Sequence, residues 1–378
     1  MTHIFIVNEN TFDYHLRYLF AGTGYGDNEP DLDKIDGSEY HAEKTLTAMI
    51  SDISKVREDD FVIFYVRGCK KFFGIFQVAS VPFFNSLQDN YLGSKNELDK
   101  YLPFRIKIKP YRVYPIGVTE HSALDEIDGL SHPYEMCWSL IYRKLAGNRG
   151  CSFVTESEYK NLKSLIEKAN TGYIDSNYFY YDKSNQIISP MHEECRYTGK
   201  TNKSLDIKNR LLHTNHSYEA HLQAYIIQNF DNCLSTLLLP NNLEKLLWIG
   251  NEVICSFGEQ RIDILIVSET PDETIIRVIE LKDDRPTSYI THQLQWYLTW
   301  TDQYIAPNLA VHNKKVKIVP TIIAKCFNRN TKRKRLFVNA FQEFNLNKPQ
   351  LKNSIISDLE FISFAFENND IMFKKEMV

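Results

Sequence analysis

The sequence predicts two domains, an α+β domain in its N-terminal half and an α/β domain with a mixed sheet in its C-terminal half. A chain of 378 residues is long for one compact domain. Short strand-like runs separated by turn residues fill the first half, whereas an order of helix, three strands, helix and strand follows residue 216. With 43% hydrophobic and 24% charged residues, the chain can bury a sizeable core.

The N-terminal domain is expected over residues 1–168. Its strand-like runs are "HIFIVN", "DFVIFYV", "FFGIFQVAS" and "FRIKIKPYRVY". A helix, "VTESEYKNLKSLIEKA", closes the domain, and Thr155 and Glu158 have the spacing of a capping box at its start. Residues 169–215 are rich in Tyr, Ser, Asn and Lys without a sustained period, so we expect a connector there.

The C-terminal domain is expected over residues 216–378. It begins with a helix, "HSYEAHLQAYIIQNF", for which Ser217 is a plausible N-cap. Three strands follow, "LLWIGNEVICSF", "RIDILIVS" (after a turn at Gly258) and "TIIRVIELK". A second helix, "SYITHQLQWYLTWTDQY", then precedes the strand "KVKIVPTIIAKCF". This order predicts a mixed α/β sheet.

Composition narrows the possible classes of function. A formal charge of −4 argues against a uniformly basic nucleic-acid coat, although local basic faces remain possible. No apolar run approaches the roughly 20 residues of a membrane-spanning helix, and the first residues lack the features of a signal peptide. Seven cysteines without repeated CxxC spacing fit reduced thiols, so we expect a cytoplasmic protein. No GxxxxGK[ST] loop is present, so ATP-driven translocation is not expected.

The run "VIELKDD" carries the strongest chemical signal. Glu280 and Lys282 share one face of the expected strand because side chains alternate along it. Asp263 lies within the apolar run of the preceding strand, where a carboxylate is costly to bury unless it is paired or holds a cation. Two carboxylates can hold Mg²⁺, which activates a bound water, and the lysine can orient that water or stabilise developing charge. The alternative is a solvated ion pair at an ordinary strand exit.

Together, "RID…VIELK" resembles the catalytic core of the PD-(D/E)xK nuclease superfamily over residues 215–330, although "RID" lacks the motif's proline. Glu219, on the preceding helix, matches an additional acidic residue of that superfamily. "HQLQWYL" resembles the "QLxxY" motif of one branch, and Gln293 is expected to face the carboxylates. The resemblance implies a restriction-endonuclease-like mixed sheet that binds Mg²⁺ (or Mn²⁺) through Asp263 and Glu280. It makes Lys282, Glu219 and Gln293 the other catalytic candidates.

The segment "REDDFVIFYVRGCKKFFGIFQVAS" resembles the signature of EVE and related PUA-like domains. Three further segments match that family in the right order, so the resemblance covers residues 1–168. It implies a PUA-like β-barrel with an aromatic pocket for a flipped, modified base. For each aromatic residue, ordinary core packing is the competing interpretation. The candidates for this pocket are Asn8, Phe20, Tyr25, Tyr65 and Trp138.

Two basic clusters could contact DNA phosphates. Arg67, Lys70 and Lys71 are expected at a hairpin tip. The run "RNTKRKR", residues 329–335, is a second basic patch or else a solvated loop.

A base-reading domain joined to a nuclease predicts a modification-dependent restriction endonuclease. Such an enzyme would cleave double-stranded DNA carrying modified cytosine, and it would act as a homodimer because double-strand cleavage needs two active centres. One alternative is a restriction endonuclease that recognises a sequence of unmodified DNA. Another is a non-cleaving nucleic-acid-binding protein with a degenerate core.

Overall fold

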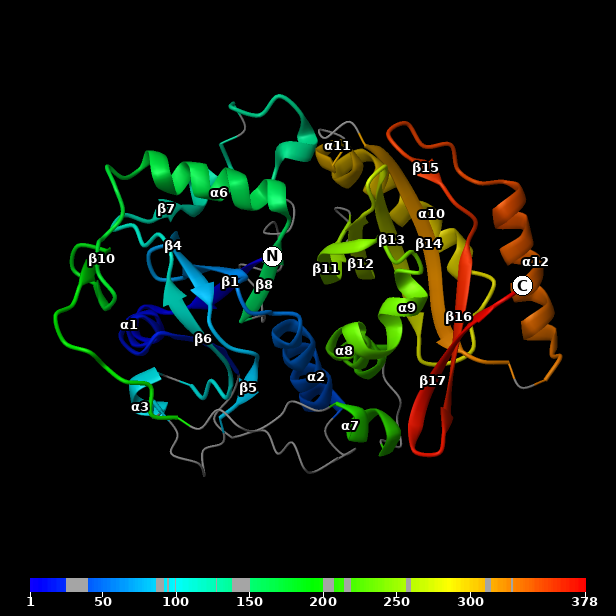
Figure 1. Ribbon diagram of the computed structural model, residues 1–378, viewed down its shortest axis with the longest axis horizontal. Helices are drawn as coiled ribbons and strands as arrows, with labels where there is room; N and C mark the ends of the chain where they lie inside the picture. Colours follow the sequence, from blue (N-terminus) through cyan, green and yellow to red (C-terminus); the bar gives the residue numbers. More distant parts are fainter. Residues whose placement is uncertain are drawn as a thin grey trace. The chain divides into compact units, whose positions relative to one another are not determined.

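The chain folds into two compact units, 1–34 with 41–206 and 35–40 with 207–378, each with its own sheet (Figure 1). This division confirms a mixed α/β architecture with two separate sheets. The computed structural model describes residues 1–24, 40–85, 92–93, 95–98, 100–126, 128–137, 150–199, 207–213, 219–255, 260–309, 314–327 and 329–378.

A curled, half-barrel sheet of eight strands forms the core of the first unit. Its main path runs β2-β6-β4-β3-β1-β8, with β5 paired to β6 and β7 paired to β4. Strands β1 and β3 are parallel, and the other pairs are antiparallel. The strands are β1 (Thr2–Val7), β2 (Phe20–Thr23), β3 (Phe61–Val66), β4 (Lys71–Val78), β5 (Phe83–Phe84), β6 (Phe104–Pro110), β7 (Val118–Thr119) and β8 (Cys151–Val154).

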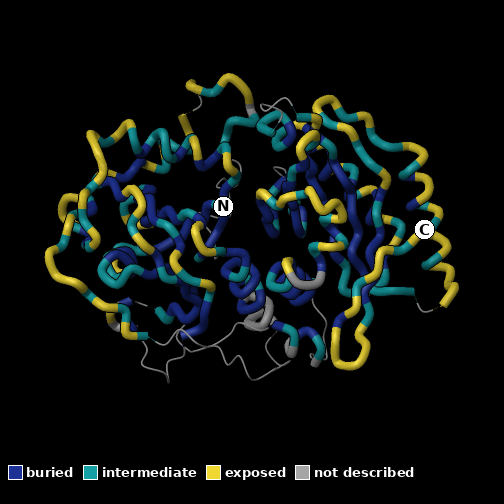
Figure 2. Tube along the Cα trace, in the orientation of Figure 1, coloured by how far each residue is buried: buried dark blue, intermediate teal, exposed yellow. Residues whose placement is uncertain are grey.

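Helices pack on both faces of this sheet, whose central strands are buried (Figure 2). On one face Phe12 of α1 packs against Phe64 of β3 with tilted rings, whose centroids are 5.3 Å apart. On the other, Tyr159 of α6 joins the buried cluster that contains Tyr65. The described helices are α1 (Glu9–Tyr18), α2 (Tyr40–Ser54), α3 (Lys95–Leu98), α4 (Glu120–Leu124), a 3-10 helix (Pro133–Glu135) and α6 (Glu156–Lys168).

The capping box expected at the start of α6 is confirmed. The Thr155 hydroxyl accepts the backbone N–H of Glu158, and the Glu158 carboxylate accepts the backbone N–H of Thr155 at 2.7 Å. The two side chains thereby satisfy two backbone donors that a helix start leaves open.

The interval 169–215, expected as a connector, is mostly part of the first unit. It contains a hairpin of β9 (Phe179–Asp182) and β10 (Ile187–Pro190). The Tyr181 ring packs against Phe12 with centroids 5.0 Å apart. The backbone N–H of Tyr181 donates to the Asp13 carboxylate at 2.9 Å. The unit boundary therefore falls at 206/207. Strands of four residues are too short to show a clear period in the sequence, which explains the difference.

Asp60 links the start of β1 to the segment before β3. Its carboxylate contacts the His3 ring at 2.8 Å and accepts from the N-terminal amine at 2.6 Å. Burial by itself raises the pKa of Asp60, but its interactions with His3 and the amine outweigh burial and lower it to about 2.

We expect Asp60→Asn to lower the free energy of unfolding at neutral pH by about 2 kcal/mol, because a pKa unit corresponds to about 1.4 kcal/mol. A depressed carboxyl pKa stabilises the fold above the unfolded value of 3.8, and this contribution is lost as the pH falls towards 2. Urea unfolding of both proteins at pH 7 and pH 3 measures this difference. A gap that stays the same at pH 3 would contradict the assignment.

The second unit contains a mixed sheet, as expected, and this sheet has seven strands. Its path is β11-β12-β13-β14-β16-β17, with β15 beside β14. The first three strands are antiparallel, β13, β14 and β16 run parallel, and β17 returns antiparallel. The strands are β11 (Lys245–Ile254), β12 (Arg261–Glu269), β13 (Glu273–Lys282), β14 (Lys315–Lys325), β15 (Ile355–Ile356), β16 (Glu360–Glu367) and β17 (Asp370–Glu376).

Two helices of the second unit, α8 and α10, lie where the sequence predicts them, whereas α7, α9, α11 and α12 were not expected. None of those described is long and apolar enough to cross a membrane. Ser217 and Gly258, expected as a helix cap and a turn, lie outside the described residues. The helices are α7 (Lys208–His213), α8 (Glu219–Gln228), a π-helical turn (Phe230–Leu234), α9 (Ser235–Leu238), α10 (Ile290–Trp300), a second π-helical turn (Thr301–Ile305), α11 (Ala306–Leu309) and α12 (Lys332–Leu346).

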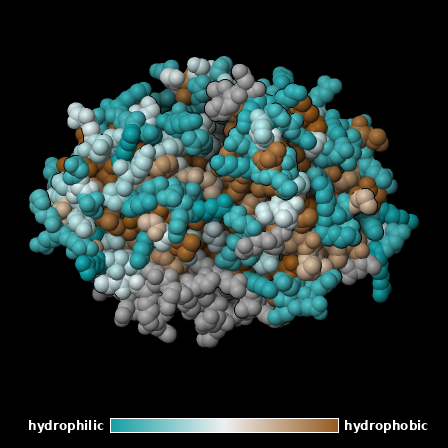
Figure 3. All heavy atoms as spheres, in the orientation of Figure 1, coloured by the Kyte–Doolittle hydropathy of each residue, from teal (hydrophilic) through white to brown (hydrophobic). Residues whose placement is uncertain are grey.

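Helix α12 covers the face of the sheet that carries Glu280. Residues directly opposite in neighbouring strands share a face, so Glu280, Ile322 and Phe361 lie on the same side. Phe337 of α12 packs edge-on against Phe361, with centroids 5.2 Å apart. Over the second unit, the surface drawn in Figure 3 shows small hydrophobic groups between hydrophilic ones.

Helix α8 approaches the other face. Its Gln223 accepts a hydrogen bond from the Asn251 side chain at 3.3 Å. Asn251 is paired with Ile264, and Ile264 is paired with Ile279, so these three side chains share one face. Ile279 and Glu280 are consecutive residues of one strand, so Glu280 points to the opposite face. Helices thus pack against both faces of the sheet, and the carboxyl end of β13 lies between them.

Candidate active site

Asp263 and Glu280 face each other across the hairpin of β12 and β13. The ladder pairs Ile264 with Ile279, so the next step outward places the two acidic residues opposite each other on one face. The Asp263 carboxylate also accepts the backbone N–H of Leu281 at 2.7 Å, which fixes it against β13. The structure therefore brings together the two residues expected as metal ligands.

Lys282 links two acidic residues. Its ammonium group donates to Glu280 Oε1 at 2.9 Å and to Glu219 Oε1 at 3.0 Å. Lys282 is the last residue of β13, and Glu219 is the first residue of α8. The Glu280 side chain is buried, whereas those of Lys282 and Glu219 are 30% and 43% exposed. The cluster is therefore closed at Glu280 and open to solvent at Lys282.

The cluster has more negative charge than its lysine can balance. Burial raises the pKa of Asp263 well above its usual range, and the Glu280 carboxylate raises it further. Burial also raises the pKa of Glu280, although Lys282 opposes this effect. For Lys282, burial lowers the pKa, but the three carboxylates outweigh burial and raise it above its ordinary value. A further cation would therefore be stabilised here.

These residues fit a divalent metal ion in one specific respect. Glu280 Oε2 is buried and has no hydrogen-bond partner among the described residues, so it is available as a ligand. Within that part of the chain, no group of three or more His, Cys, Asp or Glu side chains could hold a metal. Mg²⁺ does not require such a group, since one or two carboxylates, waters and substrate phosphate oxygens commonly complete its shell. Asp263 and Glu280 would supply those carboxylates.

Gln293, which was expected to face the carboxylates, hydrogen-bonds a tyrosine of its own helix. Its amide nitrogen donates to the Tyr297 hydroxyl at 2.7 Å. Tyr297 is buried, and its pKa is raised by burial first and by the charge of Glu280 second. Gln293 is thus linked through the Tyr297 hydroxyl to a side chain that the charge of Glu280 influences. The residues are one helical turn apart, so a small rotation of α10 decides which one points inward.

Two buried side-chain amides, which were not expected from the sequence, support the backbone of the site. Gln223, one turn after Glu219 in α8, donates to the backbone carbonyl of Asp263 at 2.9 Å, and Asn251 donates to Gln223. They join α8, β11 and β12 at the residue that carries the carboxylate. The spacing of Gln223 from Glu219 could have indicated its role, but nothing in the sequence distinguishes Asn251.

The described base-pocket candidates do not converge on one pocket. Asn8 caps α1, and its side-chain oxygen accepts the Thr11 N–H at 2.7 Å. Phe20 is fully buried and packs against His15, on the face of the sheet that carries Phe64.

Tyr65, the residue after Phe64, points to the opposite face and donates its hydroxyl to Glu120. Core packing therefore accounts for Phe20 and Tyr65. Tyr25 and Trp138 lie outside the described residues.

The expected basic hairpin is the turn between β3 and β4. Arg67 and Lys70 are exposed there, while the Lys71 ammonium donates to the Gln186 side chain at 3.0 Å. The second patch, 329–335, spans the start of α12, where the Thr331 hydroxyl accepts the Lys334 N–H. This patch is therefore a capped helix start rather than a simple loop.

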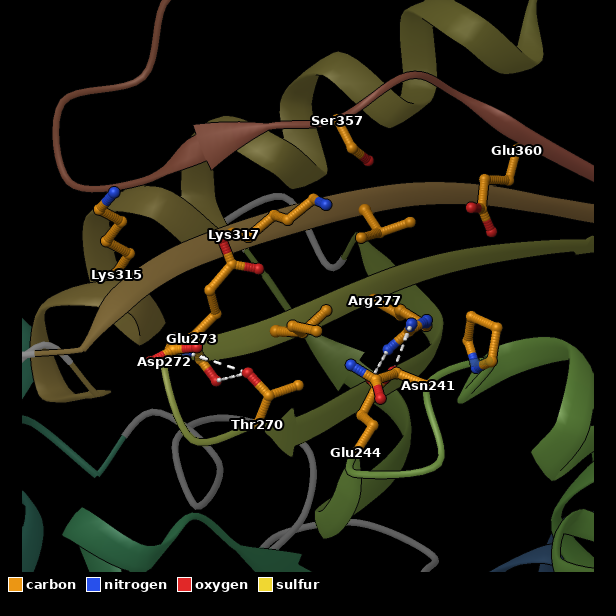
Figure 4. A pocket seen from close by; sticks show the side chains of 13 residues that line it. Asn241, Glu244, Thr270, Asp272, Glu273, Arg277, Lys315, Lys317, Ser357 and Glu360 are labelled. Carbon is orange, nitrogen blue, oxygen red and sulfur yellow. Dashed lines mark hydrogen bonds and ion pairs between the residues drawn. The ribbon is translucent and has the colours of Figure 1, made fainter.

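A pocket in the second unit lies on the other face of β13 (Figure 4). It contains the buried ion pair of Arg277 and Glu244, with Lys315 and Lys317 of β14 nearby. Arg277 is three residues from Glu280, so their side chains leave opposite faces of the strand. None of the predicted site residues lines this pocket.

Comparison with known proteins gives no identification. No family model matches the chain, and no curated protein matches it. Function is therefore inferred from the geometry of the charged cluster.

Proposed function

We propose that the protein is a metal-dependent endonuclease that hydrolyses phosphodiester bonds in DNA. The main support is the pairing of Asp263 with Glu280, whose buried Oε2 accepts no hydrogen bond from a described N–H or O–H donor, in a site with uncompensated negative charge. A structural ion pair would have its carboxylate oxygens satisfied. The adjoining lysine adds the positive charge that phosphoryl chemistry needs next to a metal.

The residues of the chain have separable roles in this proposal. Asp263 and Glu280 would hold the metal, which would supply a bound water of lowered pKa and positive charge against the phosphate. Lys282 stays protonated at neutral pH because three carboxylates raise its pKa. Its partly exposed ammonium group can orient the attacking water or stabilise charge that develops on the scissile phosphate. Glu219 holds that ammonium group from the other side.

The first unit is proposed as the DNA-reading part of a modification-dependent restriction endonuclease. Its resemblance to EVE and PUA-like domains supports this role, and the exposed Arg67 and Lys70 can contact phosphates. Recognition of modified cytosine, action as a homodimer and a cytoplasmic location remain predictions from the sequence. A base pocket, if present, requires residues other than Phe20 and Tyr65.

One assay tests the function. Full-length protein is incubated with Mg²⁺ or Mn²⁺ and with matched duplexes that contain cytosine, 5-methylcytosine or 5-hydroxymethylcytosine, and EDTA serves as the control. Metal-dependent cleavage of the modified duplexes alone supports the proposal. Equal cleavage of all three favours a sequence-specific restriction enzyme. Binding without cleavage at any metal concentration would identify a non-cleaving binding protein.

A further inference from the structure

Helix α10 presents two large aromatic side chains to solvent. Tyr289, just before its first residue, is 59% exposed, and Trp296 is 53% exposed. The other described tryptophans, Trp248 and Trp300, are buried. Single exposed apolar residues are ordinary, but two large aromatics on one short helix are a feature that core packing does not explain.

The two aromatic residues lie in one row along the helix. A separation of seven residues is nearly two full turns, so both side chains leave α10 in nearly the same direction. Gln293 lies between them in that row, four residues after Tyr289 and three before Trp296. We call Tyr289 and Trp296 the aromatic row.

The aromatic row lies at the rim of the candidate active site. Only residues 283–288 separate Lys282, the last residue of β13, from Tyr289, and α10 packs against β13. A ligand bound along the row would therefore lie near the end of β13 that carries the charged cluster.

Positive charge lies at the Tyr289 end of the row. Arg333 of α12 donates to the Asp284 carboxylate at 2.8 Å and to the Pro286 carbonyl at 3.3 Å. These bonds neutralise Asp284 and join the first turn of α12 to the segment that leads from Lys282 to α10. The same turn carries Lys332 and Arg335, both exposed. The aromatic row thus continues into a cationic surface, which complements a polyanion rather than an apolar protein partner.

We propose that the aromatic row is a stacking platform for unpaired nucleotides next to the scissile phosphate. Exposed aromatic rings bordered by cations are the combination that binds single-stranded nucleic acid, because each base has a face that can stack. Bases of an intact duplex are stacked on each other, so the platform selects DNA with an open or single-stranded segment beside the cut. This inference rests on the proposed nuclease function and specifies the form of DNA that the site accepts.

Binding of oligothymidylate in EDTA tests the platform without cleavage. A stacked base should quench the fluorescence of Trp296, so we expect quenching in the wild type and much less in Trp296→Phe, which keeps an aromatic ring. Trp296→Ala and Tyr289→Ala should each raise the Kd about tenfold, and Trp296→Tyr should largely restore it. The control variant is Leu336→Ala, which shortens an exposed apolar side chain of a different helix, α12, and should leave the Kd unchanged.

The outcomes separate this inference from the proposed function. Unchanged quenching in Trp296→Phe together with an unchanged Kd in Trp296→Ala would overturn the platform, while duplex cleavage would still support the nuclease. A change of sedimentation behaviour in Trp296→Ala, with oligonucleotide binding intact, would mark the row as a protein interface and also overturn it. If the variants Trp296→Ala and Tyr289→Ala lose oligonucleotide binding and the wild type never cleaves DNA, the platform is supported and the nuclease function is removed.

Discussion

Glu280→Gln should abolish metal-dependent cleavage of DNA while the protein stays folded and still binds DNA. The substitution keeps the shape of the side chain but removes the charge that a divalent ion needs, and Asp263→Asn should act in the same way. Mn²⁺ affinity, measured by calorimetry, should fall together with the cleavage rate.

Stability distinguishes a lost ligand from a damaged fold. Burial raises the pKa of Glu280, and a carboxyl whose pKa is raised on folding loses stabilisation as the pH increases through that value. The neutral glutamine avoids this cost, so Glu280→Gln should melt no lower than the wild type at neutral pH without metal. A matched control is Glu269→Gln in β12, which weakens an ion pair with Lys314 away from the cluster and should cleave normally. Near-normal cleavage by Glu280→Gln would remove the nuclease assignment.

The site could be predicted from the sequence where strand geometry alone decides. Alternation places Glu280 and Lys282 together, and the Lys282–Glu280 contact confirms it. The pairing with Asp263 needs only an antiparallel hairpin whose register aligns the apolar runs of both strands. Glu219 required the resemblance, because nothing local shows where a preceding helix packs.

Predictions that required tertiary packing succeeded less well. Phe20 and Tyr65 were predicted to line one pocket, yet they pack into different layers because the order of strands in the curled sheet cannot be read from the sequence. Gln293 and Tyr297 are one turn apart, so periodicity does not determine which points to Glu280. No sequence pattern indicates the role of the buried Asn251 amide, because that role depends on the position of Gln223 in α8.

Lys282→Ala should separate catalysis from metal binding. We expect the cleavage rate to fall about a hundredfold to a thousandfold, because the ammonium group acts on charge that develops during the reaction. Mn²⁺ affinity should be maintained or increased, since the substitution removes the cation that now bonds to Glu280 Oε1 and Glu219 Oε1. The metal-free variant should also be less stable at neutral pH and should regain stability as the pH falls, because its uncompensated carboxylates then take up protons. Lys314→Ala, which removes an ion-paired lysine just before β14, is the control and should leave the cleavage rate and Mn²⁺ affinity unchanged. If Lys282→Ala instead loses Mn²⁺ affinity in step with its rate, the lysine holds the carboxylates in place and does not act in the chemical step.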